Sequence, residues 1–171
     1  MKPLYKEFEP IGKSWLLDLG KYNEVPFQRK TAKTRWSISE IYEHLGTSTL
    51  DFHLAKITEA LKETTSGSKT WAGKMVFFRK NFNNKKLCSY MLESHSPNAA
   101  ENIAHSKDTM YKILKKMEEL SGLINESNKG NKSEHPILGH LTVVEWYKLV
   151  SLHFDYLSKT KNKIHQLLTQ Q

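Results

Sequence analysis

The sequence predicts an all-α protein, a four-helix bundle with a long crossover between helices two and three. Two segments begin with the Ser/Thr-x-x-Glu pattern of a helix N-terminus. Four segments carry apolar residues at helical spacing. Residues 63–95 form a connection long enough to cross the length of a bundle. With 171 residues, the chain suits one domain, expected over residues 1–171.

The first helix is expected over residues 8–22. Pro10 and Gly12 disfavour a helix near its start, because proline lacks an N–H and glycine loses more backbone entropy. Its apolar side chains are Trp15, Leu16, Leu17 and Leu19. Residues 21–35 contain proline and many polar side chains, so we expect a connector that buries Phe27.

The second helix is expected over residues 37–62. Ser37 and Glu40 form a capping box, in which each side chain accepts from a backbone N–H of the other residue. Apolar residues then follow at helical spacing: Ile38, Ile41, Tyr42, Leu45, Phe52, Ile57 and Leu61. The Thr, Ser and Gly residues at 64–68 are expected to end this helix.

The crossover, residues 63–95, shows neither helical nor strand periodicity. We expect at most a short helix in it, with its large apolar side chains mostly buried: Trp71, Met75, Val76, Phe77, Phe78 and Phe82. Such a long connection lets helices two and three run parallel. The third helix is expected over residues 97–123, with Ser96 as N-cap and Pro97 at the first helical position.

The fourth helix is expected over residues 142–168, after a polar loop at 125–134. Thr142 and Glu145 form a second capping box. Leu141 and Trp146 stand where a hydrophobic staple packs. Its apolar face is expected to contain Trp146, Val150, Phe154, Leu157, Ile164 and Leu168.

The charge and the composition bear on partners and location. The net charge is +8, but the lysines are spread along the chain and only Arg29, Arg35 and Arg79 are arginine. This dispersion favours a solvated surface, so we expect no nucleic-acid partner. No apolar run is long enough to cross a bilayer, so we expect no membrane partner. The lone Cys88 and the lack of an apolar signal core near Met1 predict a cytoplasmic location.

Two histidines lie where facing helices can share a metal ion. His153 falls within the apolar face of the fourth helix, and His44 lies at the flank of the second, beside the small residues Ser48 and Ala55. Imidazole nitrogens bind zinc at roughly 2.0–2.1 Å. The alternative is that each histidine is a buried residue satisfied by a hydrogen bond.

The other histidines are expected to be solvated surface residues. His53 is about half a helical turn away from the direction of His44 and is expected to face elsewhere. His140 precedes the fourth helix and can approach the mouth of the site. The remaining ones fall off a stripe, in loops or near the chain end: His95, His105, His135 and His165. For Cys88, a passive thiol is favoured over a reactive one.

Two segments resemble the signature segments of the DinB/YfiT-like superfamily of four-helix bundles. They are Trp36–Leu45 and His135–Trp146, the latter leading into the helix that carries His153. The resemblance covers most of the chain. It implies that His44 is the metal ligand of the second helix and that His153 is the first ligand of an H-x-x-x-H pair on the last helix. The second position of that pair is Leu157, which implies that zinc or nickel binds weakly or not at all.

The resemblance leaves two functions open. Relatives in this superfamily include thiol-dependent S-transferases and proposed metal-dependent hydrolases, in which the ion acts as a Lewis acid on a bound thiol or water. The alternative is a non-catalytic ligand-binding or interaction bundle that has lost its metal, which Leu157 favours. The expected partners are a small-molecule thiol or another small ligand, and a second copy of the chain in a homodimer.

Overall fold

The computed structural model describes residues 3–30, 36–80 and 99–169, and it is predominantly helical. The longer helices are α1 (Pro3–Asp18), α3 (Ile38–Thr47), α4 (Leu54–Lys62), α7 (Ile103–Leu123) and α8 (Val143–Thr169). The shorter elements are the 3₁₀ turn η1 (Leu19–Lys21), α2 (Glu24–Gln28), the π-helical turn η2 (Ser48–His53), α5 (Trp71–Arg79) and the strands β1 (Lys132–His135) and β2 (Gly139–Thr142). None of the helices in the described ranges has an apolar stretch that could cross a bilayer.

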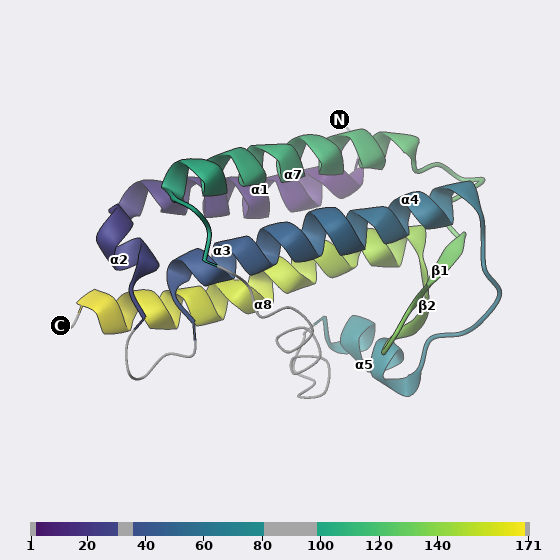
Figure 1. Cartoon of the computed structure of the whole chain (residues 1–171). Helices are drawn as coiled ribbons and strands as arrows, with labels where there is room; N and C mark the ends of the chain where they lie inside the picture. Colours follow the sequence, from purple (N-terminus) through teal and green to yellow (C-terminus); the bar gives the residue numbers. More distant parts are fainter. Residues whose placement is uncertain (1–2, 31–35, 81–98, 170–171) are drawn as a thin grey trace.

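The long helices lie side by side (Figure 1). α3 and α4 continue one another along one axis and run in the same direction as α7, whereas α1 and α8 run in the opposite direction. α1 packs against α7 and α8, and α3 packs against the same two helices. The chain therefore returns along the length of the molecule between α4 and α7, and α5 belongs to this return.

The core between these helices is rich in aromatic side chains that meet edge to face. The Phe154 ring centroid lies 5.2 Å from that of Phe8 and 5.7 Å from that of Trp15. The Trp15 and Tyr42 centroids are 5.1 Å apart, and the Tyr42 hydroxyl donates to the Trp15 carbonyl at 2.8 Å. Full burial of each such side chain contributes roughly 1.5–3 kcal/mol. This cluster joins α1, α3 and α8.

Both capping boxes predicted from the sequence are present. The Ser37 N–H donates to Glu40 Oε2 at 2.7 Å, and the Glu40 N–H donates to Ser37 Oγ at 3.1 Å. At the start of α8, the Thr142 N–H donates to Glu145 Oε2 at 2.9 Å and the Glu145 N–H donates to Thr142 Oγ1 at 3.1 Å. These reciprocal bonds satisfy N–H groups that a helix start leaves unpaired, so both helices begin within one residue of the predicted position.

The predicted bounds of the first helix are wrong by several residues. α1 begins at Pro3 and contains Pro10, which was expected to lie near the start of the helix. Tyr5 and Phe8 are buried, so apolar packing holds the turns before Pro10 despite the hydrogen bond that this residue cannot form. The predicted burial of Phe27 in the connector is confirmed, because α2 places its ring in the core.

The third long helix begins later than predicted. Ser96 and Pro97, the expected start, lie outside the described residues, and α7 begins at Ile103. Asn102 is the N-cap: its side-chain oxygen accepts the His105 N–H at 2.7 Å. Asparagine is among the best N-cap residues because its short side chain reaches the free N–H groups of the first turn.

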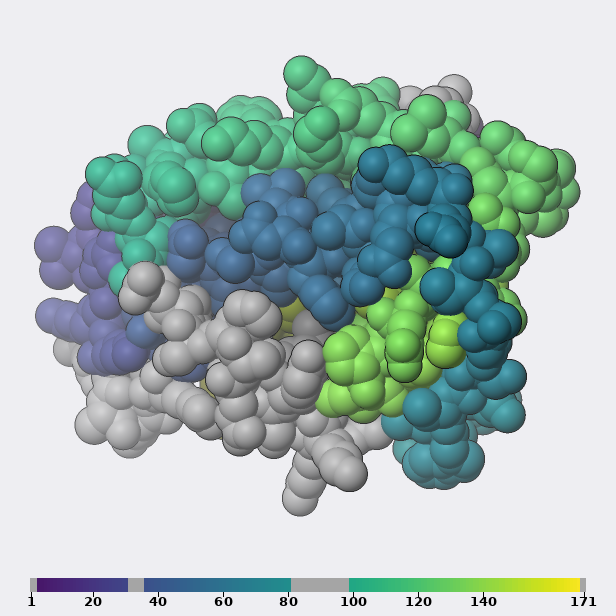
Figure 2. Space-filling view, turned by 45° about the vertical axis from the view of Figure 1, so that its right-hand side comes forward, coloured from purple at the N-terminus to yellow at the C-terminus, as the bar shows by residue number. Residues whose placement is uncertain are grey.

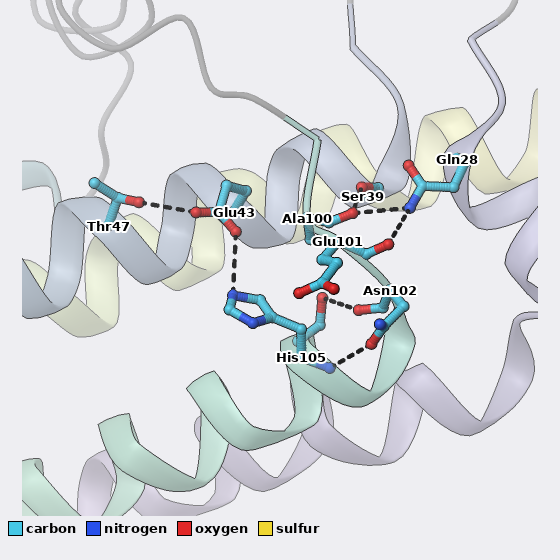
Figure 3. Close-up of polar contacts among 9 residues, drawn as sticks. Gln28, Ser39, Glu43, Thr47, Ala100, Glu101, Asn102 and His105 are labelled. Carbon is cyan, nitrogen blue, oxygen red and sulfur yellow. Dashed lines mark hydrogen bonds and ion pairs between the residues drawn. The ribbon is translucent and has the colours of Figure 1, made fainter.

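The segment before α7 is tied to α2 and α3 (Figure 3). The Ala100 carbonyl accepts from the Gln28 side-chain amide at 2.8 Å and from the Ser39 hydroxyl at 3.1 Å. The Glu24 carboxylate accepts the Ile103 N–H at 3.0 Å, which places a negative charge at the positive end of the α7 dipole. These bonds set the start of α7 against α3.

Over the described residues, the structure agrees with the predicted all-α class except for a small β-hairpin, which was not predicted and which replaces the end of the polar loop. β1 and β2 pair antiparallel, from Lys132 opposite Thr142 to His135 opposite Gly139. Gly139 has φ +75°, in the left-handed region that favours glycine. Figure 2 shows that the chain following α4 runs along this hairpin. The Thr70 N–H donates to the Leu138 carbonyl at 2.9 Å and joins the two segments.

The crossover does contain a short helix, α5, as predicted, but its side chains are less buried than expected. Val76 is buried, whereas Trp71 is 75% and Phe78 is 83% exposed. Phe82 lies outside the described residues. The expectation that the large apolar residues here are mostly buried is therefore wrong for Trp71 and Phe78.

Candidate metal centre

Three histidines meet in the core between α3, η2 and α8. His44 lies on α3, His53 ends η2 and His153 lies on α8. All three are buried, with exposed fractions of 1%, 0% and 0%. The His153 ring centroid is 5.3 Å from that of His44 and 5.4 Å from that of His53. The structure thus brings together the two histidines singled out from the sequence and adds a third.

His53 was expected to face elsewhere, and this prediction is wrong. In a regular α-helix the nine residues from His44 to His53 make roughly two and a half turns, which would place the two rings on opposite faces. The Leu54 N–H instead donates to the Thr49 carbonyl, five residues back, in the π-helical pattern. The wider turn takes up an additional residue and rotates His53 back toward the side of His44. We find no sequence signal that predicts this π-helical turn.

The burial of the rings favours their neutral form. Burial, with smaller contributions from His135 and His44, lowers the pKa of His53 to about 3. Burial, together with the neighbouring rings of His53 and His44, lowers the pKa of His153 well below its usual value. Both rings are therefore neutral at pH 7. A neutral imidazole keeps the lone pair that a metal ion needs.

The ring nitrogens of His53 have no hydrogen-bond partner among the residues that the structure describes. A buried polar group without a partner costs roughly 1–3 kcal/mol, so such a group in a core calls for a physical explanation.

His135, expected on the surface, is buried at the edge of this cluster. Its Nδ1 accepts the backbone N–H groups of Ile137 at 3.0 Å and Leu138 at 3.2 Å, which closes the hairpin turn. Burial lowers its pKa to about 4. Its ring centroid is 5.3 Å from that of Trp146. Because Nδ1 is occupied by the turn, His135 has a structural role that explains its burial.

The remaining histidines in the described residues lie away from the core trio. His105 is partly exposed, and its Nε2 is 3.7 Å from Glu43 Oε2 (Figure 3). His165 packs edge-on against the Tyr22 ring, with centroids 5.4 Å apart. His140, expected to approach the mouth of the site, lies in β2 with its ring directly against Gly67. His95 and Cys88 lie outside the described residues.

On α8 the positions one and two turns after His153 offer no second imidazole to the core. Leu157, one turn later, is buried with 1% exposure and has no lone pair to donate. Lys161, one turn further, forms an ion pair with Asp18, and its Nζ lies 4.0 Å from the centroid of the Trp15 ring. This helix therefore contributes one imidazole to the core.

The spacing of the rings fits a shared ion. Zinc–nitrogen bonds of about 2.0–2.1 Å, with each ring centre roughly 1 Å further out, place the centres of two tetrahedrally arranged imidazoles roughly 5 Å apart. The observed separations of 5.3 and 5.4 Å match this value. Among the residues described, however, no three His, Cys, Asp or Glu side chains form a ready-made metal-binding group. An ion would therefore require the rings to turn.

Comparison of the sequence with models of known protein families gives no match, and comparison with curated proteins gives none either. The buried histidines, through their chemistry and spacing, are therefore the features of this chain that indicate a function.

Proposed function

We propose that this protein is a DinB/YfiT-like four-helix bundle that binds a divalent metal ion, zinc or nickel, through His44 and His153. The observation that carries this proposal is the pair of buried imidazoles from facing helices, with centroids 5.3 Å apart. Imidazole nitrogen suits both metals. The shared direction of α3–α4 and α7, opposite to α1 and α8, supports the bundle.

The surroundings of the pair suit a metal site. The Trp36 ring lies edge-on to His44, with centroids 5.0 Å apart, and limits how that ring can tilt. His153 is neutral at pH 7 because burial disfavours its charged form. A bound ion would supply a Lewis acid that lowers the pKa of a coordinated thiol or water, the chemistry of a thiol S-transferase or a hydrolase.

The second candidate is a non-catalytic bundle with a ligand-binding or interaction role. Leu157 favours it, because an apolar side chain stands where the resemblance implies a ligand. The complete burial of His53 and His153 also favours it, since a catalytic ion keeps a coordination position open to its substrate.

Zinc titration of the untagged protein, followed by calorimetry, tests the proposal. We expect one ion per chain, with affinity reduced by at least about 100-fold in His44→Leu and in His153→Leu, because loss of an outer-shell partner alone costs 10–100-fold. His105→Leu is the control for a surface histidine and should retain the wild-type affinity. A wild type that binds no zinc, or core variants that behave like His105→Leu, would overturn the proposal.

Turnover separates the two candidates once binding is established. Zinc-loaded or nickel-loaded protein that transfers a small thiol to an electrophile, with the activity lost in His153→Leu, supports the enzyme. Stoichiometric metal without such turnover or hydrolysis supports the non-catalytic bundle.

A further inference from the structure

We propose that His53 is the third imidazole ligand of this metal site, supplied by the π-helical turn η2 instead of by α8. The inference depends on the proposed function of the His44–His153 pair and assigns the ligand that Leu157 cannot provide. The resulting set has three histidines: two from the continuous run α3–η2–α4 and one from α8.

The first support is the position of His53 relative to His153. The two ring centroids are 5.4 Å apart, against 5.3 Å between His44 and His153. His153 thus has two histidine neighbours, His44 and His53, at nearly the same distance. Both separations are those of imidazoles that share one tetrahedral ion, roughly 5 Å.

The second support is the state of the His53 side chain. It is completely buried, and its two ring nitrogens find no hydrogen-bond partner in the described residues. The buried His135 nearby shows the usual solution, because its Nδ1 accepts two backbone N–H groups. A leucine at position 53 would avoid the cost of burying polar atoms without partners. Binding a metal ion would explain why an imidazole occupies this position.

The third support is the π-helical turn itself. π-helical turns are rare, and those that do occur are often found at functional sites. They interrupt the regular hydrogen bonding of a helix and redirect its side chains. Here the turn spans Ser48–His53 and brings His53 to the side of His44. Without it, the same sequence would direct the two rings to opposite faces.

The rings do not converge as they stand, so binding requires them to turn about their Cβ–Cγ bonds. The torsion about this bond in histidine has a broad, roughly two-fold profile, so the bond itself opposes the rotation only weakly and the packing of the neighbouring side chains sets its cost. The two ring pairs that include His153 already have the required spacing. The remaining pair, His44 and His53, has to come closer as the rings turn.

The test combines zinc affinity with a count of bound imidazoles by X-ray absorption at the zinc edge. For wild type we expect three imidazoles. For His53→Leu we expect two, with affinity lower by at least about 100-fold. His105→Leu is the matched control and should keep three imidazoles and the wild-type affinity. Circular dichroism verifies that each variant is folded.

The outcomes separate this inference from the proposed function. If wild type binds zinc and His53→Leu retains both its affinity and its imidazole count, His53 is not a ligand, whereas the role of His44 and His153 stands. If wild type binds no zinc, both fail. If His53→Leu does not fold, the wild-type count decides: three imidazoles that fall to two in His53→Gln support the inference, and two imidazoles in wild type overturn it.

Discussion

Lys161 shows how a single buried charge is accommodated in this core. Its side chain has 1% exposure, pairs with Asp18 and lies over the face of Trp15, with Nζ 4.0 Å from the ring centroid. Burial lowers the pKa of Lys161, while the hydrogen bond with Asp18 raises it. Burial alone would raise the pKa of Asp18, but the hydrogen bonds from Lys161 and Lys21 outweigh it, and the pKa is lowered. The pair ties the end of α1 to α8.

Removing the carboxylate of Asp18 should cost more stability than replacing Lys161 with an uncharged side chain. Asp18→Asn leaves the buried ammonium without its counter-charge, so we expect a loss of about 3 kcal/mol in the free energy of unfolding. Lys161→Met keeps an unbranched side chain over Trp15 and removes the buried charge, so we expect a change within about 1 kcal/mol. Urea denaturation at pH 7 measures both. A larger loss in Lys161→Met than in Asp18→Asn would contradict this account.

At the scale of elements, the docking of α5 against the hairpin depends on Gly73. A Cβ atom at this position would lie 2.3 Å from the Leu138 carbonyl oxygen, a backbone atom that cannot move without displacing the hairpin turn. The same two elements are joined by the Thr70 side chain, which donates to the Ile137 carbonyl at 2.8 Å. Close approach of the two backbones therefore requires glycine.

Gly73→Ala should therefore lower the free energy of unfolding by about 1–3 kcal/mol, the usual cost of forcing extra volume into a packed contact. Gly20→Ala is the matched control, because no atom lies within 4 Å of its added Cβ. We expect the control to be neutral or slightly stabilising, since alanine reduces the entropy of the unfolded chain. Thermal melts of the two variants compare them. Equal melting temperatures would contradict the close contact.

The elements differ in how far the sequence could predict them, for physical reasons. The helices that start after Ser37 and Thr142 were placed to within one residue, because a capping box is a local signal. The start of α1 depends on the burial of Phe8, a tertiary effect that outweighs the local cost of Pro10. The hairpin strands have only four residues each, too few for a clear alternation.

The histidines, too, differ in how far the sequence could predict their positions. His44 and His153 could be chosen from helical spacing, since each lies on a helix with regular turns up to its position. His53 could not, because its direction depends on one π-helical turn. His135 was misplaced because the strand that buries it was itself not predicted. Errors in predicting the site thus arose from errors in the local backbone.

For the whole molecule, the buried neutral histidines predict a sensitivity to acid. The folded-state pKa is lowered to about 3 for His53 and to about 4 for His135, from a usual value of 6.5. Below about pH 6.5 the unfolded chain therefore binds protons that the folded chain does not, so stability falls as the pH falls. Each such histidine contributes a slope of about 1.4 kcal/mol per pH unit.

With His153, whose pKa is also lowered well below its usual value, three histidines predict a slope of about 4 kcal/mol per pH unit between about pH 5.5 and 4.5, and a nearly flat profile above about pH 7. Urea denaturation across this range, with a chelator present throughout, measures the slope. His53→Leu should reduce it by about a third, because one of three titrating groups is removed. A profile that stays flat down to pH 4.5 would show that these rings are charged, or accessible to protons, in the folded protein.

The central claim, a metal site formed by buried histidines, is tested most directly by anomalous diffraction from crystals grown with zinc. We predict an anomalous peak in the core between α3, η2 and α8, within about 2 Å of ring nitrogens of His44, His53 and His153. A core without a peak, with zinc only at exposed residues such as His105, would contradict the claim.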